Sequence, residues 1–159
     1  MDPRDEPEDD KNKRRAGVNF RGAVTTAMAS NGLYLLLCSG EHEKIQMAAM
    51  IASVAAVSER PVEVFVSMNA ILAFAAEVPQ AGRSRGGEFA KLLRDKHAPD
   101  PIALLRQGKQ LGELKVWACS MALDIQQWEM GNLVKDLFEG PLGLTKFLSD
   151  AEAGQFVTL

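Results

Sequence analysis

The chain has 159 residues, 47% of them hydrophobic and 25% charged, a composition typical of one soluble globular domain. Its net charge of −3 leaves no basic excess to neutralise phosphates, which argues against nucleic acid as the main partner. Two cysteines are too few for a disulfide framework, so the sequence favours a reducing, cytoplasmic setting.

The first 20 residues are expected to form a charged, disordered tail. Acidic residues gather at positions 2–10 and basic ones at 11–15, and apolar side chains are nearly absent. Such a segment cannot offset its ordering entropy by burial, and it lacks the apolar core of a signal peptide. The most apolar run, 64–78, is shorter than the roughly 20 residues that a membrane-spanning helix needs. We therefore expect no transmembrane segment, and a folded domain over residues 21–159.

The first strand and helix follow from the apolar pattern. Leu33–Leu37 is continuously apolar, which predicts a strand covered on both faces. A helix is predicted from Glu41 to Ser58, with Ser39 capping its first turn. From 45 to 57 this helix has only two polar residues, so we expect it to be buried between the sheet and a further surface. A second subunit would supply that surface, and the sequence thus predicts a homo-oligomer.

Strands and helices alternate along the rest of the chain. The sequence predicts strands at 62–66, 115–118 and 155–159, helices at 69–76, 88–96, 101–110 and 142–151, and a mobile loop at 78–87. A further helix is expected after the third strand, with Ser120 as its N-cap. Crossovers of helical length join parallel strands. The pattern therefore predicts a single three-layer α/β domain with a mostly parallel central sheet of four or five strands.

Cys119 is the first candidate for chemistry. It is predicted at the carboxyl end of the third strand and directly before a helix, where an α/β domain holds its ligand crevice. The positive end of a helix dipole there stabilises a thiolate, which favours sulfur or redox chemistry. A buried, unreactive cysteine remains the alternative, because free cysteine is often a small core residue.

Cys38 is the second thiol and ends the first predicted strand. If the first strand neighbours the third, as we expect here, both thiols face one crevice. Cys38 is then a resolving or relay thiol for Cys119, and the alternative is a small core residue.

Five further side chains are candidates for accessory roles. His42, in the first turn of the helix after Cys38, either bonds a thiolate or is a partly exposed histidine at a helix start. Lys44 either adds positive potential near the crevice or is solvated. The hydroxyl of Ser39 and the helix start at Ser120 flank the thiols, and Asp124 is expected to support the local turn.

No cofactor and no metal site are predicted. The chain has two cysteines and two histidines without the close spacing of metal ligands. The run Gly82–Gly87 is glycine-rich and basic, but it lacks the Lys-Ser/Thr that completes a phosphate-binding loop. We interpret it as a surface loop.

Three short motifs resemble the DsrE/DsrF-like family. The run 39–44 (Ser-Gly-Glu-His-Glu-Lys) resembles the family's Ser-Gly-Asp-x-x-Lys element, and 118–124 (Ala-Cys-Ser-Met-Ala-Leu-Asp) is similar to its Ala-Cys-x-x-Ser/Thr-Met-Asp neighbourhood. Phe147-Leu148 resembles part of the family's closing Ala-x-Phe-Leu helix. The run 121–123 (Met-Ala-Leu) departs from the usual Ser/Thr and Met. The resemblance covers residues 31–159.

The resemblance implies a flavodoxin-like domain that assembles into dimers, trimers or hexamers. It also implies that the matched cysteine, Cys119, carries sulfane sulfur as a persulfide or thiosulfonate and exchanges it with donor and acceptor proteins. The leading hypothesis is thus a cytoplasmic sulfur carrier or sulfurtransferase, with enzymatic turnover left open. The alternative is an oligomeric binding or scaffold protein with a structural cysteine. A thiol peroxidase is disfavoured, because residues 112–119 lack the Pro-x-x-x-Thr/Ser-x-x-Cys arrangement of peroxiredoxins.

Overall fold

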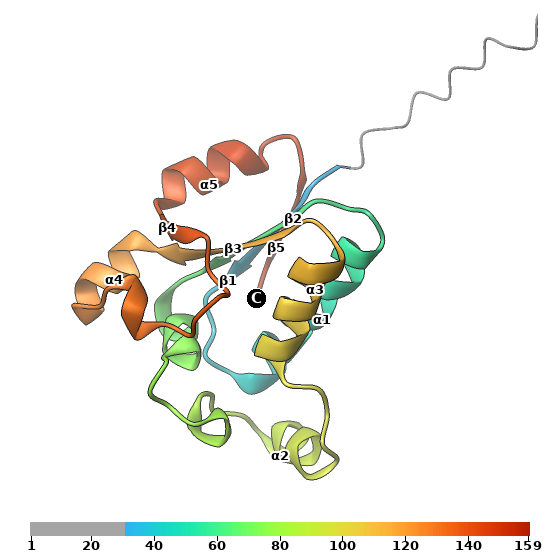
Figure 1. The fold of residues 1–159 in the computed structure, drawn as a ribbon, viewed down its shortest axis with the longest axis vertical. Coiled ribbons are helices and arrows are strands. Elements are labelled where there is room, and N and C mark those ends of the chain that lie inside the picture. Colours follow the sequence, from blue (N-terminus) through green and yellow to red (C-terminus); the bar gives the residue numbers. More distant parts are fainter. Residues whose placement is uncertain (1–30) are drawn as a thin grey trace, which may run out of the picture.

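A computed structural model describes residues 31–159, so the predicted tail at 1–20 lies outside the described residues. Five strands form one sheet in the order β4-β3-β2-β1-β5, and every pairing is parallel (Figure 1). The strands are β1 (Leu33–Leu37), β2 (Val62–Val66), β3 (Leu114–Cys119), β4 (Gly140–Leu142) and β5 (Gln155–Thr158). The predicted α/β domain with a mostly parallel sheet is confirmed.

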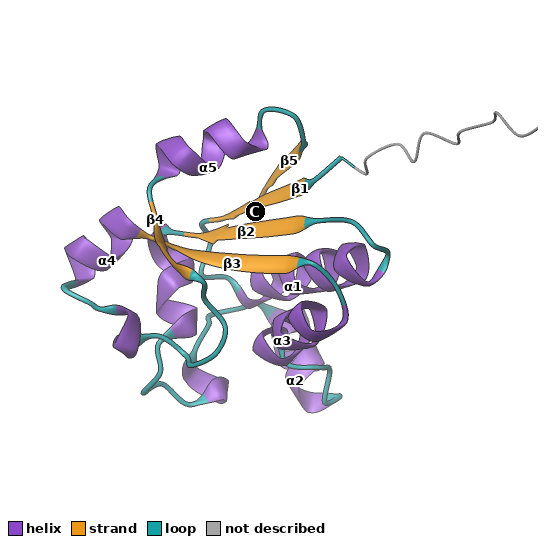
Figure 2. Cartoon of the chain, turned by 45° about the horizontal axis from the view of Figure 1, so that its top comes forward, coloured by secondary structure: helices purple, strands orange, loops and turns teal. Residues whose placement is uncertain are grey.

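Helices lie on both faces of the sheet, which makes the predicted three layers. The α-helices are α1 (His42–Val57), α2 (Glu88–Asp95), α3 (Pro101–Leu111), α4 (Ser120–Gln126) and α5 (Leu144–Ala151), and the 3-10 turns are η1 (Met68–Phe74), η2 (Gln80–Gly82) and η3 (Met130–Asn132). Helices α1 and α3 pack side by side on one face, whereas α5 lies on the other (Figure 2). Among residues 31–159, no helix is long and apolar enough to cross a membrane.

The main core lies between the sheet and the α1–α3 layer. It contains alternate residues of the three central strands, namely Leu33, Leu35, Leu37, Val62, Val64, Val66, Leu114, Val116 and Ala118, all buried. Alanines on α1 face them and let the helix approach closely. The two polar residues of its apolar stretch 45–57 are both buried, and each donates a hydrogen bond: Ser53 Oγ to the Leu104 carbonyl at 2.7 Å, and Gln46 Nε2 to the Pro99 carbonyl at 3.0 Å.

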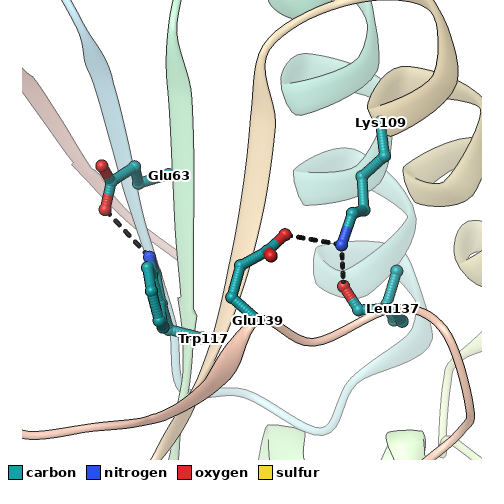
Figure 3. A network of polar contacts seen from close by, with 5 residues as sticks. All are labelled: Glu63, Lys109, Trp117, Leu137 and Glu139. Atoms are coloured by element: carbon teal, nitrogen blue, oxygen red, sulfur yellow. Dashed lines mark hydrogen bonds and ion pairs between the residues drawn. The ribbon is translucent and has the colours of Figure 1, made fainter.

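The opposite face is covered mainly by α5. The ring of Phe147 is fully buried and stacks on Phe65 with a centroid separation of 4.9 Å, and it meets Tyr34 edge-on at 5.8 Å. Because one short helix cannot cover the whole face, Trp117 stays partly exposed there. Its indole N–H donates to Glu63 Oε2 at 2.9 Å across the β2–β3 pair (Figure 3).

The carboxyl-terminal part of the domain differs from the sequence prediction. The helix predicted at 142–151 begins at Leu144, and the three residues Gly140–Leu142 form strand β4 instead. This strand pairs with the end of β3, with Cys119 opposite Leu142. Lys109 of α3 holds the segment just before this strand. Its Nζ donates to the Leu137 carbonyl at 2.7 Å and pairs with Glu139 at 2.6 Å (Figure 3).

Two other segments also differ. The helix predicted at 69–76 is the 3-10 turn η1, which the chain enters through Met68 at φ 48°. The loop predicted at 78–87 includes η2, and contacts of Arg83 and Arg85 hold its second half in place. Arg83 Nη1 donates to the Ala75 carbonyl at 2.7 Å, and the backbone around Arg85 bridges to Glu41 at the start of α1.

Within residues 31–159 nothing covers the outer face of α1, the face that the sequence expects a second subunit to cover. Its outer face exposes Met47, Met50, Val54 and Val57, at 48%, 46%, 68% and 54%. These four positions follow helical spacing and make one apolar stripe. We refer to them below as the α1 stripe.

Candidate functional site

The two thiols lie in one row at the carboxyl edge of the sheet. Strand pairing places Leu37, Val66 and Ala118 side by side. The residues that follow them, Cys38, Ser67 and Cys119, therefore form the next row. Since side chains alternate along a strand, this row points to the α5 face, the face that carries Trp117.

The expected strand order was wrong, and this changes the relation between the thiols. Strand β2 lies between β1 and β3, and β5 takes the other side of β1. With strands about 4.8 Å apart, the Cα atoms of Cys38 and Cys119 are about 10 Å apart, and a disulfide tolerates about 7 Å. A direct disulfide between them needs movement of the backbone.

Cys119 nevertheless influences the Cys38 thiol. Burial raises the pKa of the Cys38 thiol, and the neighbouring Cys119 raises it further. Cys38 is partly exposed, whereas Cys119 is only 3% exposed. At neutral pH Cys38 is therefore held mainly as the protonated thiol, which is a weak nucleophile.

Cys119 has the predicted place at the end of a strand and the start of a helix. It is the N-cap of α4, with backbone φ −61° and ψ 117°, and no side chain caps the helix. The prediction that Ser120 is the N-cap was wrong, because Ser120 is already the first helical residue. Asp124 is exposed on α4, and its carbonyl accepts from Gln127 N at 3.1 Å where the helix ends.

The candidates at the start of α1 make their side-chain polar contacts with groups other than the thiols. Ser39 Oγ accepts a hydrogen bond from the backbone N–H of Glu41 at 3.2 Å, but Glu41, not Ser39, is the N-cap. Lys44 is exposed and pairs with Glu41 at 3.2 Å. His42 Nδ1 lies 2.8 Å from Ser84 Oγ, so its hydrogen bond goes to the 78–87 segment.

The environment of His42 favours its neutral form. Burial lowers the pKa of its imidazole, and the nearby Arg94 guanidinium lowers it further against the opposite effects of Glu43 and Asp100. Glu43 has a structural role that the sequence did not reveal. Its Oε1 accepts from the backbone N–H groups of Gly87 and Ala90 at 2.9 and 3.1 Å, at the start of α2. The hydrogen bond from its own backbone N–H, and after it the bonds from Gly87 and Ala90, lower the pKa of the Glu43 carboxyl.

A groove on the α5 face ends beside the thiol row. It has a volume of about 440 Å³ and is lined by Tyr34, Glu63, Lys115, Trp117, Leu142, Lys146 and Asp150. Trp117 precedes Cys119 by two residues on the same strand face, and Leu142 is the strand partner of Cys119. This sheet-face groove was not predicted, because its far wall depends on the unexpected strand β4.

A second crevice lies at the carboxyl end of β1. Its volume is about 510 Å³, and its lining includes Ser39, Gly40, Asn69, Arg83 and Arg85. A side chain at position 40 would place its Cβ 3.0 Å from the Asn69 carbonyl, so glycine keeps this turn close to η1. Neither cysteine lines this crevice.

Comparison with known proteins shows similarity in fold alone. No family model and no curated protein matches the chain. A protein of unknown function, MTH1491 from Methanobacterium thermoautotrophicum, superposes with a TM-score of 0.53 and 8% identity, over 81% of this chain and 99% of that one. The ychN protein from E. coli superposes with a TM-score of 0.52 and 11% identity, over 80% of this chain and 99% of that one. Both have the DsrE-like fold, a flavodoxin-like arrangement.

Proposed function

We propose that this chain handles sulfur, carrying sulfane sulfur as a persulfide on Cys119. The main support is the position of that thiol at the carboxyl edge of the sheet, directly beyond a groove on the same sheet face. The likeness of the fold to DsrE-like proteins agrees with this proposal. Donor and acceptor proteins, and a cytoplasmic setting, belong to the same proposal.

The proposed step is an exchange of sulfur between thiols. The Cys119 thiolate attacks the terminal sulfur of a donor persulfide, a new S–S bond forms, and the donor's own S–S bond breaks. The donor leaves as a thiolate, and an acceptor thiolate removes the sulfur by the same exchange in reverse. No oxidant or reductant is consumed.

A donor can reach Cys119 only if the residues that bury this thiol move. The thiol is 3% exposed, and Leu142 beside it belongs to a strand of three residues at the edge of the sheet. We expect movement of this short strand to admit the donor. Cys38 is not the carrier in this scheme, because its raised pKa keeps it protonated.

Mass spectrometry of the intact protein tests the carrier. After exposure to polysulfide, the native protein is expected to gain one sulfur atom, and Cys119→Ser is expected to lose that gain completely. Cys38→Ser is the matched control and retains it. If Cys119 takes no sulfur in the native protein but is fully labelled after unfolding, the thiol is structural and the carrier hypothesis fails.

An oligomeric binding or scaffold protein is the second candidate. The burial of Cys119 favours it, and so does the α1 stripe, which bears no charge. An uncharged stripe of this kind suits the same stripe of a second copy, which is the homo-oligomer that the sequence predicts.

Sedimentation checks the predicted assembly. We expect the chain to sediment as a species larger than the 17.3 kDa monomer, and Val54→Glu to shift it to the monomer by placing a charge in the stripe. Leu111→Glu, at an equally exposed position (61%) outside the stripe, is the control and keeps the assembly. A monomeric native chain would contradict the expectation.

A further inference from the structure

A third cavity lies on the other side of the sheet from the thiol row. It has a volume of about 410 Å³, is open to solvent on one side, and is bordered by the first half of α1, the turn η2, the end of α2 and the start of α3. Its lining includes the side chains of His42, Gln46, Arg94, His97 and Asp100. Ligand sites for small molecules fall in the range of roughly 300–1,000 Å³, so the cavity is large enough to hold one.

Gln46 on the wall of this cavity has an unsatisfied oxygen. The residue is 5% exposed, and its Nε2 donates to the Pro99 carbonyl at 3.0 Å, which fixes the orientation of the amide. Its Oε1 is buried and has no hydrogen-bond partner, the one such side-chain atom among the described residues. A buried acceptor without a partner costs about 1–3 kcal/mol. A ligand that brings a donor to this oxygen recovers that cost.

Charges of both signs border the same cavity. The guanidinium of Arg94 is exposed on α2 and makes no hydrogen bond or ion pair within residues 31–159. Asp100 uses Oδ2 to accept from Ala103 N at 3.0 Å, which caps α3 and leaves its other oxygen available. A guanidinium, a carboxylate and a buried neutral acceptor together match a ligand that has an anionic end and a donor end.

We propose that this cavity binds a small zwitterion of the α-amino-acid class. Its carboxylate pairs with Arg94, and its ammonium group donates to Gln46 Oε1 and to Asp100. The remaining volume accommodates the amino-acid side chain. The accessible surface of Gln46 Oε1 is less than 1 Å². The residues that line the cavity therefore have to move slightly before the ammonium group can reach this oxygen. The site is independent of the thiol chemistry proposed above, since the sheet separates the two.

Titration calorimetry with the full chain tests the site. The probes are free L-amino acids of each side-chain class and, for any that binds, its N-acetyl derivative and its carboxamide. We expect at least one free amino acid to bind, and each blocked form to bind at least tenfold more weakly, because each loses one charge-assisted contact. Absence of binding by every amino acid at about 10 mM, or equal binding of the N-acetyl form, overturns the proposal.

Substitutions in the cavity lining and just outside it locate the binding. Arg94→Gln is expected to weaken binding at least tenfold, whereas Lys91→Gln, on the same helix and outside the cavity lining, leaves it unchanged. Gln46→Met removes the buried oxygen and is expected to weaken binding too, with thermal unfolding measured alongside to show that the variant is folded. Equal affinity of Arg94→Gln and Lys91→Gln would place the ligand elsewhere and refute the site.

Discussion

Replacing Phe147 by alanine is expected to lower the free energy of unfolding by about 3–5 kcal/mol. The ring is fully buried, stacks on Phe65 and meets Tyr34 edge-on, and it anchors α5 to the sheet. Because α5 is the main cover of that face, the surrounding elements have little means to close the resulting cavity. Urea unfolding measures the change directly.

The next residue provides a matched control. Leu148 lies on the same helix and is 45% exposed. Leu148→Ala is expected to change the free energy of unfolding by less than about 1 kcal/mol. Equal destabilisation by the two substitutions would mean that α5 does not pack on the sheet as described.

Gly112→Ala is expected to destabilise the domain by about 3 kcal/mol. A Cβ at this position would lie 2.1 Å from the carbonyl oxygen of Ala56 and 2.4 Å from its carbon. These are backbone atoms near the end of α1, so no side-chain rotation relieves the collision. The ends of α1 and α3 have to separate, and the buried contacts between these helices weaken.

The control for this substitution is Gly131→Ala, because a Cβ there meets no atom within 4 Å. We expect that variant to unfold at nearly the wild-type urea concentration. Hydrogen exchange should show faster opening of α1 and α3 in Gly112→Ala alone. Wild-type stability of Gly112→Ala would refute the close approach of the two helices.

The sequence predicts the central strands well because burial on both faces leaves a continuous apolar run. Leu33–Leu37 and Val62–Val66 have the bounds predicted for them. Strand β4 could not be predicted in this way, since Gly140, Pro141 and Leu142 have no strand pattern and are ordered by pairing with β3. Strand order is equally hidden, because β1, β2 and β3 present similar apolar faces. The wrong prediction that the strands of Cys38 and Cys119 are neighbours follows from that ambiguity.

In the candidate sites, too, the sequence predicts what local pattern determines but not what depends on tertiary packing. The place of Cys119 at a strand end follows from local pattern, but its burial depends on elements distant in sequence, including Leu142 opposite it. Gln46 stands out in the sequence as a polar residue in an apolar helix. Only the fold shows that its Nε2 is paired and its Oε1 is not.

The two edges of the sheet differ in their openness to strand addition from another chain. Strand β4 is three residues long and contains Pro141, which has no N–H to offer a new neighbour. Such an edge resists pairing with a foreign strand. Strand β5 has no proline and keeps its outer edge unpaired among the described residues. If molecules of this protein ever join through their sheets, in assembly or in aggregation, the contact forms along Gln155–Thr158.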